Sequence, residues 1–463
     1  MNNPAPATPT IPSKVFLRGC DSFLLALDTV MQRTGQGEHL GQTIVELGAG
    51  FNLEKFQNAV RELTTRHPIL IAPIRRTFFS GAYWKVPAQV NRSLPVSLWR
   101  EKESPGQLFP KAEVIESSPA FLVHILNTPL AMKREWNNVR FDLIEQRDGQ
   151  VLLAATWTHL LFDGIGAELL LIELARLSEP NAPAHPRAIE PPKENLPVRQ
   201  QMDRSKAFVQ RFSKLVRTKF TSLGGPVPKP GKACCQIVTL DARDSAEIKN
   251  RAQRSSLLNM PFYLACATRA HARVLQQRGI TPESFIISLP VQTRRKGASA
   301  IFQNQVSILF FHFTPDDLTT VETAVHTVQN QFSDMTRHRL DESFSTVLNL
   351  MRRLPSWLYT QFLRRQFGGE LTCFFHSHTG AFAPDLKSVC GAELTNGYHV
   401  PTVSTPPGTG IFLSERNGLL TITFSWREGV ISDSERKLLL SQFIEDLMGG
   451  VRTIAVQQLA EAV

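Results

Sequence analysis

A histidine, an aspartate and a glycine stand close together in the segment His159-Leu-Leu-Phe-Asp163-Gly164. The imidazole of histidine has an unperturbed pKa of about 6.5, so its neutral form can take up a proton at neutral pH. His159 is therefore a candidate general base. A histidine and an aspartate that only stabilise the turn after a core strand would show the same spacing, so the motif by itself leaves both interpretations open.

The segments on either side of the motif predict a strand that leads into a helix. Residues 151–157 are almost continuously apolar, which is typical of a strand buried on both faces. From Gly166 onward, apolar residues recur at helical spacing. An Asp-Gly turn at 147–150 predicts a hairpin that pairs residues 139–146 with the motif strand. His159 would then follow a strand end in an antiparallel or mixed sheet, where a rigid scaffold presents reactive groups.

The segment from Thr158 to Gly164 resembles the His-His-x-x-x-Asp-Gly motif of the chloramphenicol acetyltransferase-like superfamily. This superfamily includes condensation domains, plant-type acyltransferases and bacterial wax ester synthase/diacylglycerol acyltransferases. The likeness extends from about residue 15 to residue 450, and the chain departs from the pattern at Thr158, Gln303 and His378, where His, Gly and Asn are usual. Four further stretches resemble the family in order: 51–70 with its closing Arg-His-Pro, Leu289-Pro-Val-Gln-Thr-Arg294 followed by Gln303-Asn304, Ser377-His378-Thr379-Gly380, and 418–425.

The resemblance implies an α/β (α+β) fold with two halves, each a mixed sheet flanked by helices, and an active-site tunnel between them. It implies an O- or N-acyltransferase that moves an acyl group from acyl-CoA or an acyl-carrier protein to a hydroxyl or amine acceptor. His159 would be the general base, and a coenzyme A or phosphopantetheine thioester would be the co-substrate. We expect no bound cofactor and no metal. Because no Gly-x-Ser-x-Gly elbow occurs, we also expect no covalent acyl-enzyme.

Other residues acquire expected roles from the same resemblance. In the superfamily the motif aspartate points away from the histidine, so Asp163 is expected to pair with Arg294 and to support the loop that carries His159. Gly164 is expected where the Cβ of another residue would clash. The second half offers three further candidates for the site, which are Asn304, His376 and His378.

Basic residues after Arg294 are candidates for binding the phosphates of the donor. With Arg294 paired to Asp163, the resemblance leaves Arg295 and Lys296 free to contact coenzyme A or a phosphopantetheine arm. A solvated loop between two strands would explain the same cluster.

The length of 463 residues exceeds what one hydrophobic core normally supports. We expect a disordered tail at 1–12, an N-terminal half at 13–180 that carries the motif, and a C-terminal half at 232–463. Between the halves, the composition of 181–231 predicts a Pro-rich crossover linker that contains a basic amphipathic helix at 203–220. This helix either packs on the second half or docks on a membrane surface or an acidic carrier protein. A short apolar run at 121–126 predicts a further strand.

The charge and hydropathy of the chain limit its partners and its location. A net charge of +10 favours acidic partners such as coenzyme A, an acidic carrier protein or anionic lipid, and no recognised motif indicates nucleic acid. The chain lacks a membrane-spanning apolar run, and its first residues lack the layout of a signal peptide. We therefore expect a cytoplasmic protein that could also contact a membrane peripherally.

Two other functions fit the sequence. The chain could be a free-standing condensation domain that forms amide bonds between carrier-bound substrates. Alternatively, it could keep the fold without the chemistry and recruit a carrier protein or a lipid surface.

Overall fold

Two mixed β-sheets form the framework of the structure, a computed structural model that describes residues 12–77, 81–130, 135–179, 188–189, 197–294, 300–365 and 369–450. The larger sheet has the strand order β13-β14-β2-β8-β7-β5-β6. Its strands are β2 (Leu40–Leu47), β5 (Val96–Glu101), β6 (Glu113–Ile115), β7 (Val139–Glu145), β8 (Val151–Thr158), β13 (Ser388–Val389) and β14 (Ala392–Pro401).

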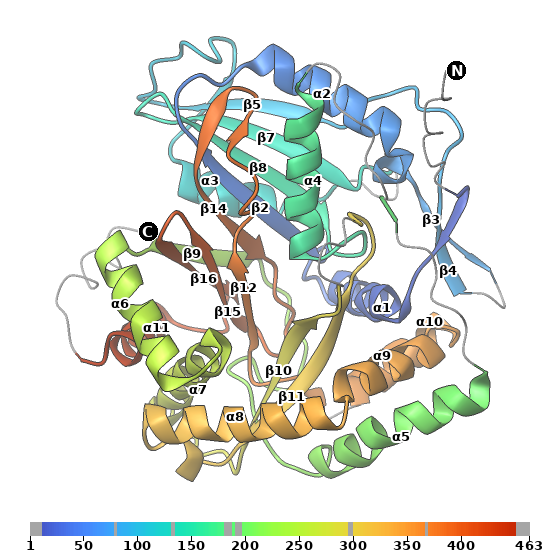
Figure 1. Ribbon diagram of the computed structural model, residues 1–463, viewed down its shortest axis with the longest axis vertical. Coiled ribbons are helices and arrows are strands. Elements are labelled where there is room, and N and C mark those ends of the chain that lie inside the picture. Colours follow the sequence, from blue (N-terminus) through green and yellow to red (C-terminus); the bar gives the residue numbers. More distant parts are fainter. Residues whose placement is uncertain are drawn as a thin grey trace, which may run out of the picture.

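The motif strand β8 lies near the middle of this sheet and is buried on both faces. Alternate residues of β8 face opposite sides, as the twofold period of a strand requires. Leu153 packs in the core under α2 (Leu53–Arg66) and α4 (Gly164–Leu177), whereas Leu152 packs in the core under α3 (Ser118–Leu126). The hairpin with β7 is present, with Val151 opposite Glu145. Figure 1 shows α2 and α4 together in front of the sheet.

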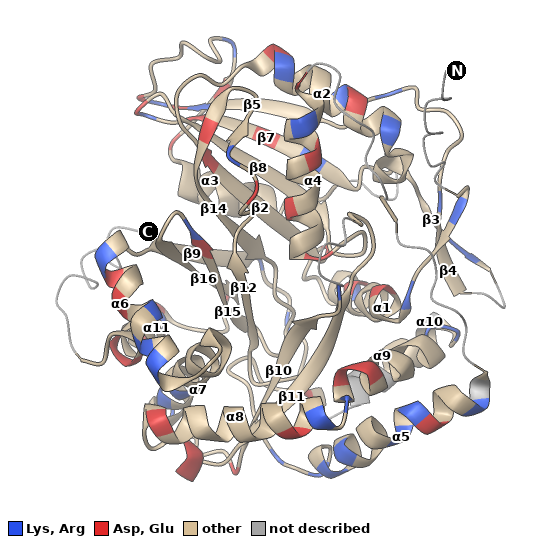
Figure 2. Ribbon diagram, in the orientation of Figure 1, with Lys and Arg blue, Asp and Glu red and all other residues tan. Residues whose placement is uncertain are grey.

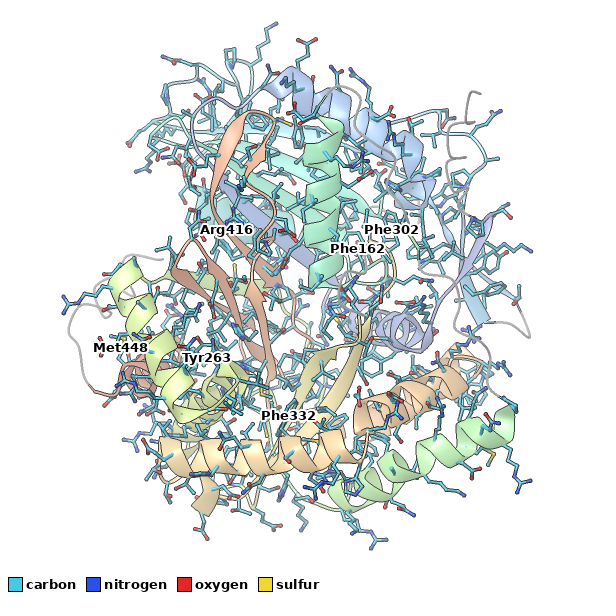
Figure 3. The ribbon with its side chains drawn as sticks, viewed as in Figure 1. Phe162, Tyr263, Phe302, Phe332, Arg416 and Met448 are labelled. Atoms are coloured by element: carbon cyan, nitrogen blue, oxygen red, sulfur yellow. The ribbon has the colours of Figure 1, made fainter. Side chains whose placement is uncertain are left out.

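The second sheet has the strand order β11-β10-β12-β15-β16-β9. Its strands are β9 (Ala233–Thr239), β10 (Phe285–Gln292), β11 (Val306–Phe313), β12 (Phe375–Ala381), β15 (Thr409–Arg416) and β16 (Leu419–Arg427). Four helices share its main core, which are α6 (Ala242–Ser255), α7 (Asn259–Gln277), α8 (Val321–Arg337) and α11 (Asp433–Met448). Figure 3 shows how densely side chains fill both halves, with Tyr263 in this second core and with Phe162 and Phe302 close together in the first.

A third group of elements lies beside the junction of the two halves. It consists of α1 (Gly19–Arg33), α5 (Val198–Leu215), α9 (Leu340–Met351) and α10 (Ser356–Arg365). A small sheet of β1 (Lys14–Phe16), β3 (Ile74–Thr77) and β4 (Gly81–Lys85) adjoins α1, and two 3-10 turns, Pro68–Ile71 and Asp316–Leu318, complete the set.

The two sheets do not separate at residue 232, where the sequence suggested a boundary. Strand β14 belongs to the C-terminal half of the chain but pairs antiparallel with β2, with Tyr398 opposite Ile44. Without β14, β2 would be an open edge with unpaired backbone groups. Tyr398 and Val400 are also buried with Ile44 and Leu40 in the core under α3. The second half of the chain therefore completes the first sheet.

The run at 121–126 is helical, so the prediction of a strand there was wrong. Helix α3 begins after Ser117, whose backbone is extended, and Pro119 lies in its first turn, where proline favours helix initiation. Phe121, Leu122, Ile125 and Leu126 are buried and Val123 and His124 are not, which is the pattern of one helix face.

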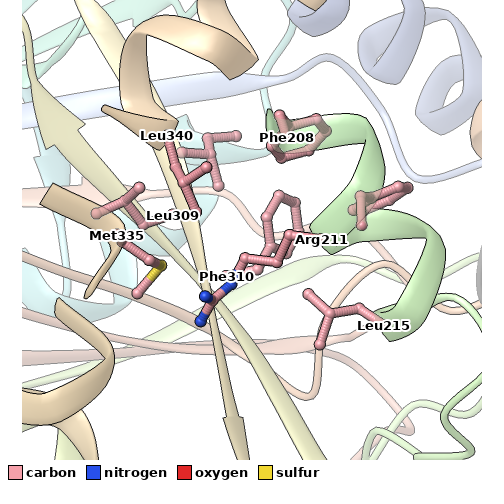
Figure 4. A pocket seen from close by; sticks show the side chains of 9 residues that line it. Phe208, Arg211, Leu215, Leu309, Phe310, Met335 and Leu340 are labelled. Carbon is pink, nitrogen blue, oxygen red and sulfur yellow. The ribbon is translucent and has the colours of Figure 1, made fainter. Parts of the chain in front are cut away.

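The basic crossover helix packs on the second half, as the first of its two interpretations predicted. The ring of Phe208 on α5 lies 4.5 Å from that of Phe344 on α9, measured between centroids. Arg211 on the polar side donates to Asp334 Oδ2 at 2.6 Å. Figure 4 shows Phe208 and Leu215 facing Leu309 and Leu340. No helix in the described part of the chain combines the length and apolar character that a membrane crossing requires.

Candidate functional site

A cavity of about 1050 Å³ lies between the two halves. This volume is at the upper end of the range of about 300–1,000 Å³ for small-molecule sites. Its wall includes His39, just before β2, His159, just after β8, and His399 on β14. Strand β12 of the second sheet contributes His376 and His378. The expected site between the halves therefore has a physical counterpart.

His159 is held at the end of β8 through its backbone. Its N–H donates to the carbonyl oxygen of His39 at 3.1 Å, and its carbonyl oxygen accepts from Nδ2 of Asn304 at 2.9 Å. The ring stacks on that of His39 at 5.0 Å and meets the edge of Trp157 at 5.2 Å. Nδ1 is enclosed by protein and the side chain lines the cavity, so Nε2 is the nitrogen that a substrate can reach.

The imidazole of His159 is suited to act as a base. Burial lowers its pKa, and this effect outweighs a hydrogen bond with its own backbone, the charge of Asp163 and a hydrogen bond with Asn304, all of which raise the pKa. A lowered pKa keeps the ring neutral at pH 7, with a lone pair free to accept a proton. Its activity as a base would be lost at a lower pH than that of an ordinary histidine.

Asp163 and Arg294 form the expected buried ion pair. Arg294 Nη1 donates to Asp163 Oδ1 at 2.6 Å and to Oδ2 at 2.8 Å, and each side chain is 5% exposed. Asp163 also accepts from the backbone N–H groups of Gly166 at 2.8 Å and Gln305 at 2.9 Å. These four contacts commit the carboxylate to joining the start of α4 to the second half, which leaves it no role as an orienting partner of His159.

The close backbone approach assigned to Gly164 occurs at Gly166 instead. A Cβ at Gly166 would lie 2.6 Å from the carbonyl oxygen of Ile301, whereas a Cβ at Gly164 would lie 3.4 Å from His399 Nε2, which is an ordinary contact. The physical reason is that the first turn of α4 packs against the backbone of the segment that follows residue 299.

Asn304 supports His159 rather than facing the cavity. Its Nδ2 donates to both the His159 carbonyl and Oδ1 of Asp21, and its backbone N–H donates to the same Asp21 oxygen. Gln303 precedes it with a φ of +80°, a left-handed conformation that glycine adopts more readily. This conformation gives a physical reason for the glycine that the superfamily usually carries at the position.

His376 and His378 both line the cavity, but their surroundings differ. His378 Nε2 lies 3.0 Å from Glu415 Oε1. His376 is 1% exposed, and burial lowers its pKa to about 3, so its ring stays neutral at any ordinary pH. The structure brings both side chains into the same cavity as His159, and their part in any reaction stays a proposal.

Sequence reasoning missed His39 and His399. Strand β2 pairs with β8 so that Leu40 is opposite Thr158, which places His39 directly beside His159. The pairing of these two strands is the signal that would have revealed it. His399 comes from β14, and its Nε2 contacts Glu168 Oε1 at 2.9 Å. Because β14 crosses from the other half of the chain, no local pattern places His399 here.

Arg295 and Lys296, the candidates for binding donor phosphates, lie outside the described residues. The cavity itself offers no alternative, since neither lysine nor arginine is among the described residues that line it.

Buried histidines predict a fold that loses stability in mild acid. Burial lowers the pKa of His271 to about 4 and that of His376 to about 3. Below pH 6.5 these two histidines take up protons in the unfolded chain but not in the folded chain, so their contribution to stability is nearly constant above pH 6.5 and falls as the pH drops towards 4. We expect a loss of about 2 kcal/mol per histidine between pH 7 and pH 5 in denaturant unfolding.

The variant His376→Phe should remove the share of about 2 kcal/mol that His376 contributes to this pH dependence, because its imidazole no longer titrates. An unfolding free energy that is the same at pH 7 and pH 5 would contradict the assignment of two buried neutral imidazoles.

Comparisons with known proteins identify the fold. No protein-family model matches the chain, and no curated protein sequence matches it. The first condensation domain of the CDA synthetase is similar in structure, with a TM-score of 0.67, 14% identity, and coverage of 97% of this chain and 96% of that chain. The trichothecene 15-O-acetyltransferase from Fusarium sporotrichioides is also similar, with a TM-score of 0.66, 13% identity, and coverage of 94% of this chain and 95% of that chain.

A starter condensation domain of rhizomide synthetase, solved in complex with C8-CoA and Leu-SNAC, has a TM-score of 0.65 at 13% identity and covers 94% of each chain. The chain thus has the two-lobed mixed α/β fold of these condensation domains and of the acetyltransferase, as the resemblance implied. Since a fold can host different reactions, the activity has to be argued from the site.

Proposed function

We propose that the protein is an acyltransferase that moves an acyl group from a thioester to a hydroxyl or amine acceptor, with His159 as general base. The observation that carries the proposal is the position of the His159 imidazole at the wall of a cavity shared by both halves, on a backbone held by His39 and Asn304. Burial there lowers the pKa of the ring. The similar structures, which include an acetyltransferase and a condensation domain with C8-CoA, support this reaction class.

The proposed reaction proceeds by direct attack. Nε2 of His159 takes the proton of the acceptor hydroxyl or amine as the acceptor attacks the thioester carbonyl carbon. The tetrahedral intermediate then expels the thiolate, which receives the proton back from His159. Cys20 also lines the cavity, but burial, followed by the charges of Asp21 and Asp163, raises the pKa of its thiol well above the ordinary value. A thiol of that kind is a poor nucleophile, which supports transfer without an acyl-enzyme.

The donor phosphates are proposed to bind at Arg295 and Lys296. Changing both residues to Glu should raise the donor KM several-fold with little change in kcat, since remote phosphate contacts act equally in the ground and transition states. The effect should shrink with added salt, because exposed charges are screened. Steady-state kinetics at low and high salt measure it, and an unchanged donor KM at low salt would place the phosphate site elsewhere.

Release of free thiol tests the proposed function and separates it from two alternatives. Wild-type protein should release thiol from at least one acyl-CoA when alcohols or amines are present. Turnover with carrier-bound donors alone would instead favour a free-standing condensation domain. Thiol release that is equal in wild type and His159→Ala across all donors would favour a non-catalytic member of the fold that binds a carrier protein or lipid.

A further inference from the structure

The interior of the cavity is almost free of charge. Among the described residues that line it, Asp163 is the one charged side chain, and Arg294 already pairs with it. Strands β10, β11 and β12 carry no Lys, Arg, Asp or Glu, and Figure 2 shows β10 and β11 uncoloured by charge while α5 and α8 carry blue and red residues. Burying an unpaired carboxylate, phosphate or ammonium here would be costly. The part of a substrate that enters the cavity is therefore uncharged.

One side of the cavity is lined by apolar side chains from four elements. We call this region the apolar sector. It is formed by α1, α5, β11 and α9, and representative members are Phe23, Leu27, Phe212, Phe310, Val347 and Met351.

The apolar sector begins beside His159, because one helix serves both. On α1, Asp21 accepts from Asn304 and Asp28 accepts from the backbone N–H of His39. Asn304 and His39 are the two residues that hold His159. Four residues on the neighbouring face of the same helix line the cavity, which are Cys20, Phe23, Leu24 and Leu27. Together they span an axial rise of about 10 Å. A group that reacts at His159 therefore has this apolar surface next to it.

The far end of the apolar sector opens to solvent. Val209 on α5, Val216 directly after α5 and Leu358 on α10 line the cavity, yet they are 52%, 40% and 39% exposed. The cavity thus reaches from the reaction centre to a rim of exposed apolar side chains from these two elements. A long substrate chain can extend to that rim without meeting a closed wall.

We propose that the apolar sector binds an aliphatic chain of about eight or more carbons, the length that the α1 surface spans. The inference rests on the proposed acyl transfer and names its substrate class. The chain belongs either to the acyl group of the donor or to an alcohol acceptor. Each methylene that leaves water for such a surface favours binding about fourfold. The selectivity of the enzyme should consequently grow with chain length.

Two kinetic series test the proposal and distinguish its two sources. One varies the donor from acetyl-CoA to dodecanoyl-CoA with a fixed short alcohol, and the other varies the alcohol from ethanol to dodecanol with acetyl-CoA. We expect kcat/KM to rise about fourfold per methylene in one series, at least up to the octyl member. A rise in the donor series assigns the sector to the acyl chain, and a rise in the alcohol series assigns it to the acceptor. Flat profiles in both series would overturn the proposal.

A substitution that fills the apolar sector provides the structural test. Val347→Trp should lower the octyl-to-short ratio of kcat/KM by at least about tenfold, the value of two buried methylenes. Val114→Trp is the matched control, since Val114 on β6 is 55% exposed and does not line the cavity. A ratio that falls equally in both variants, or in neither, would contradict the inference.

Direct binding separates this inference from the proposed function. In calorimetric titrations, 1-octanol or octanoyl-CoA should bind more tightly than ethanol or acetyl-CoA, and Val347→Trp should remove the difference. Such binding without turnover supports the apolar sector while rejecting the acyltransferase. Acyl transfer without any dependence of binding on chain length overturns the sector while leaving the acyltransferase intact.

Discussion

Replacing His159 with alanine is expected to lower kcat by a factor of roughly 10² to 10⁴, which is typical for the loss of a general base. The reason is that His159 lines the cavity and that burial lowers the pKa of its imidazole, which favours the neutral, basic form. The backbone bonds to His39 and Asn304 do not involve the removed ring, so the melting temperature should change little. Thiol release under saturating donor and acceptor measures the effect.

A histidine outside the cavity provides the matched control. His326 is exposed on α8 and does not line the cavity, so His326→Ala should keep wild-type turnover. Turnover of His159→Ala within a few-fold of the wild type would remove His159 from the mechanism. In that case His39, which stacks on it, becomes the next histidine to test.

Breaking the Asp163–Arg294 pair is expected to destabilise the fold strongly. Both side chains are 5% exposed, so Asp163→Asn leaves a buried guanidinium without its counter-charge, and Arg294→Ala leaves a buried carboxylate. Loss of one partner of a buried pair costs about 3–5 kcal/mol. Denaturant unfolding of each single variant should show a loss of this size, and the double variant should lose less than the sum.

The exposed pair of Lys206 and Asp203 serves as a control, because its side chains are 69% and 56% exposed. Asp203→Asn should cost less than about 1 kcal/mol. Strict additivity of the Asp163 and Arg294 variants in the double-mutant cycle would show that the two residues are not coupled and would contradict the assigned role.

Local sequence patterns were sufficient for the elements around the motif. The apolar run of β8, the Asp-Gly turn before it and the periodic residues of α4 are encoded by neighbours along the chain. Asp163 and Arg294 are far apart in sequence, so local patterns could not predict their pairing. It was predicted from the resemblance to the superfamily motifs. Where local rules and tertiary structure agree, a single sequence predicts the element.

Features that depend on long-range packing could not be predicted in this way. The run at 121–126 has the apolar character of a strand, and its helical form depends on which face is buried against the first sheet. Nothing in the local sequence of β14 indicates that it pairs with β2, which is distant along the chain. For the same reason His39 and His399 were missed, because the pairing of distant strands brings them to the cavity.

The measurement that tests the proposed acyl transfer most directly is mass spectrometry of the products. The protein would be incubated with an acyl-CoA and an excess of an alcohol, and the ester and free coenzyme A would be quantified together. We predict equal amounts of ester and free coenzyme A, formed by the wild type and reduced by roughly 10² to 10⁴ in His159→Ala. Free coenzyme A without any acylated acceptor, or ester formed equally by both proteins, would contradict acyl transfer by His159.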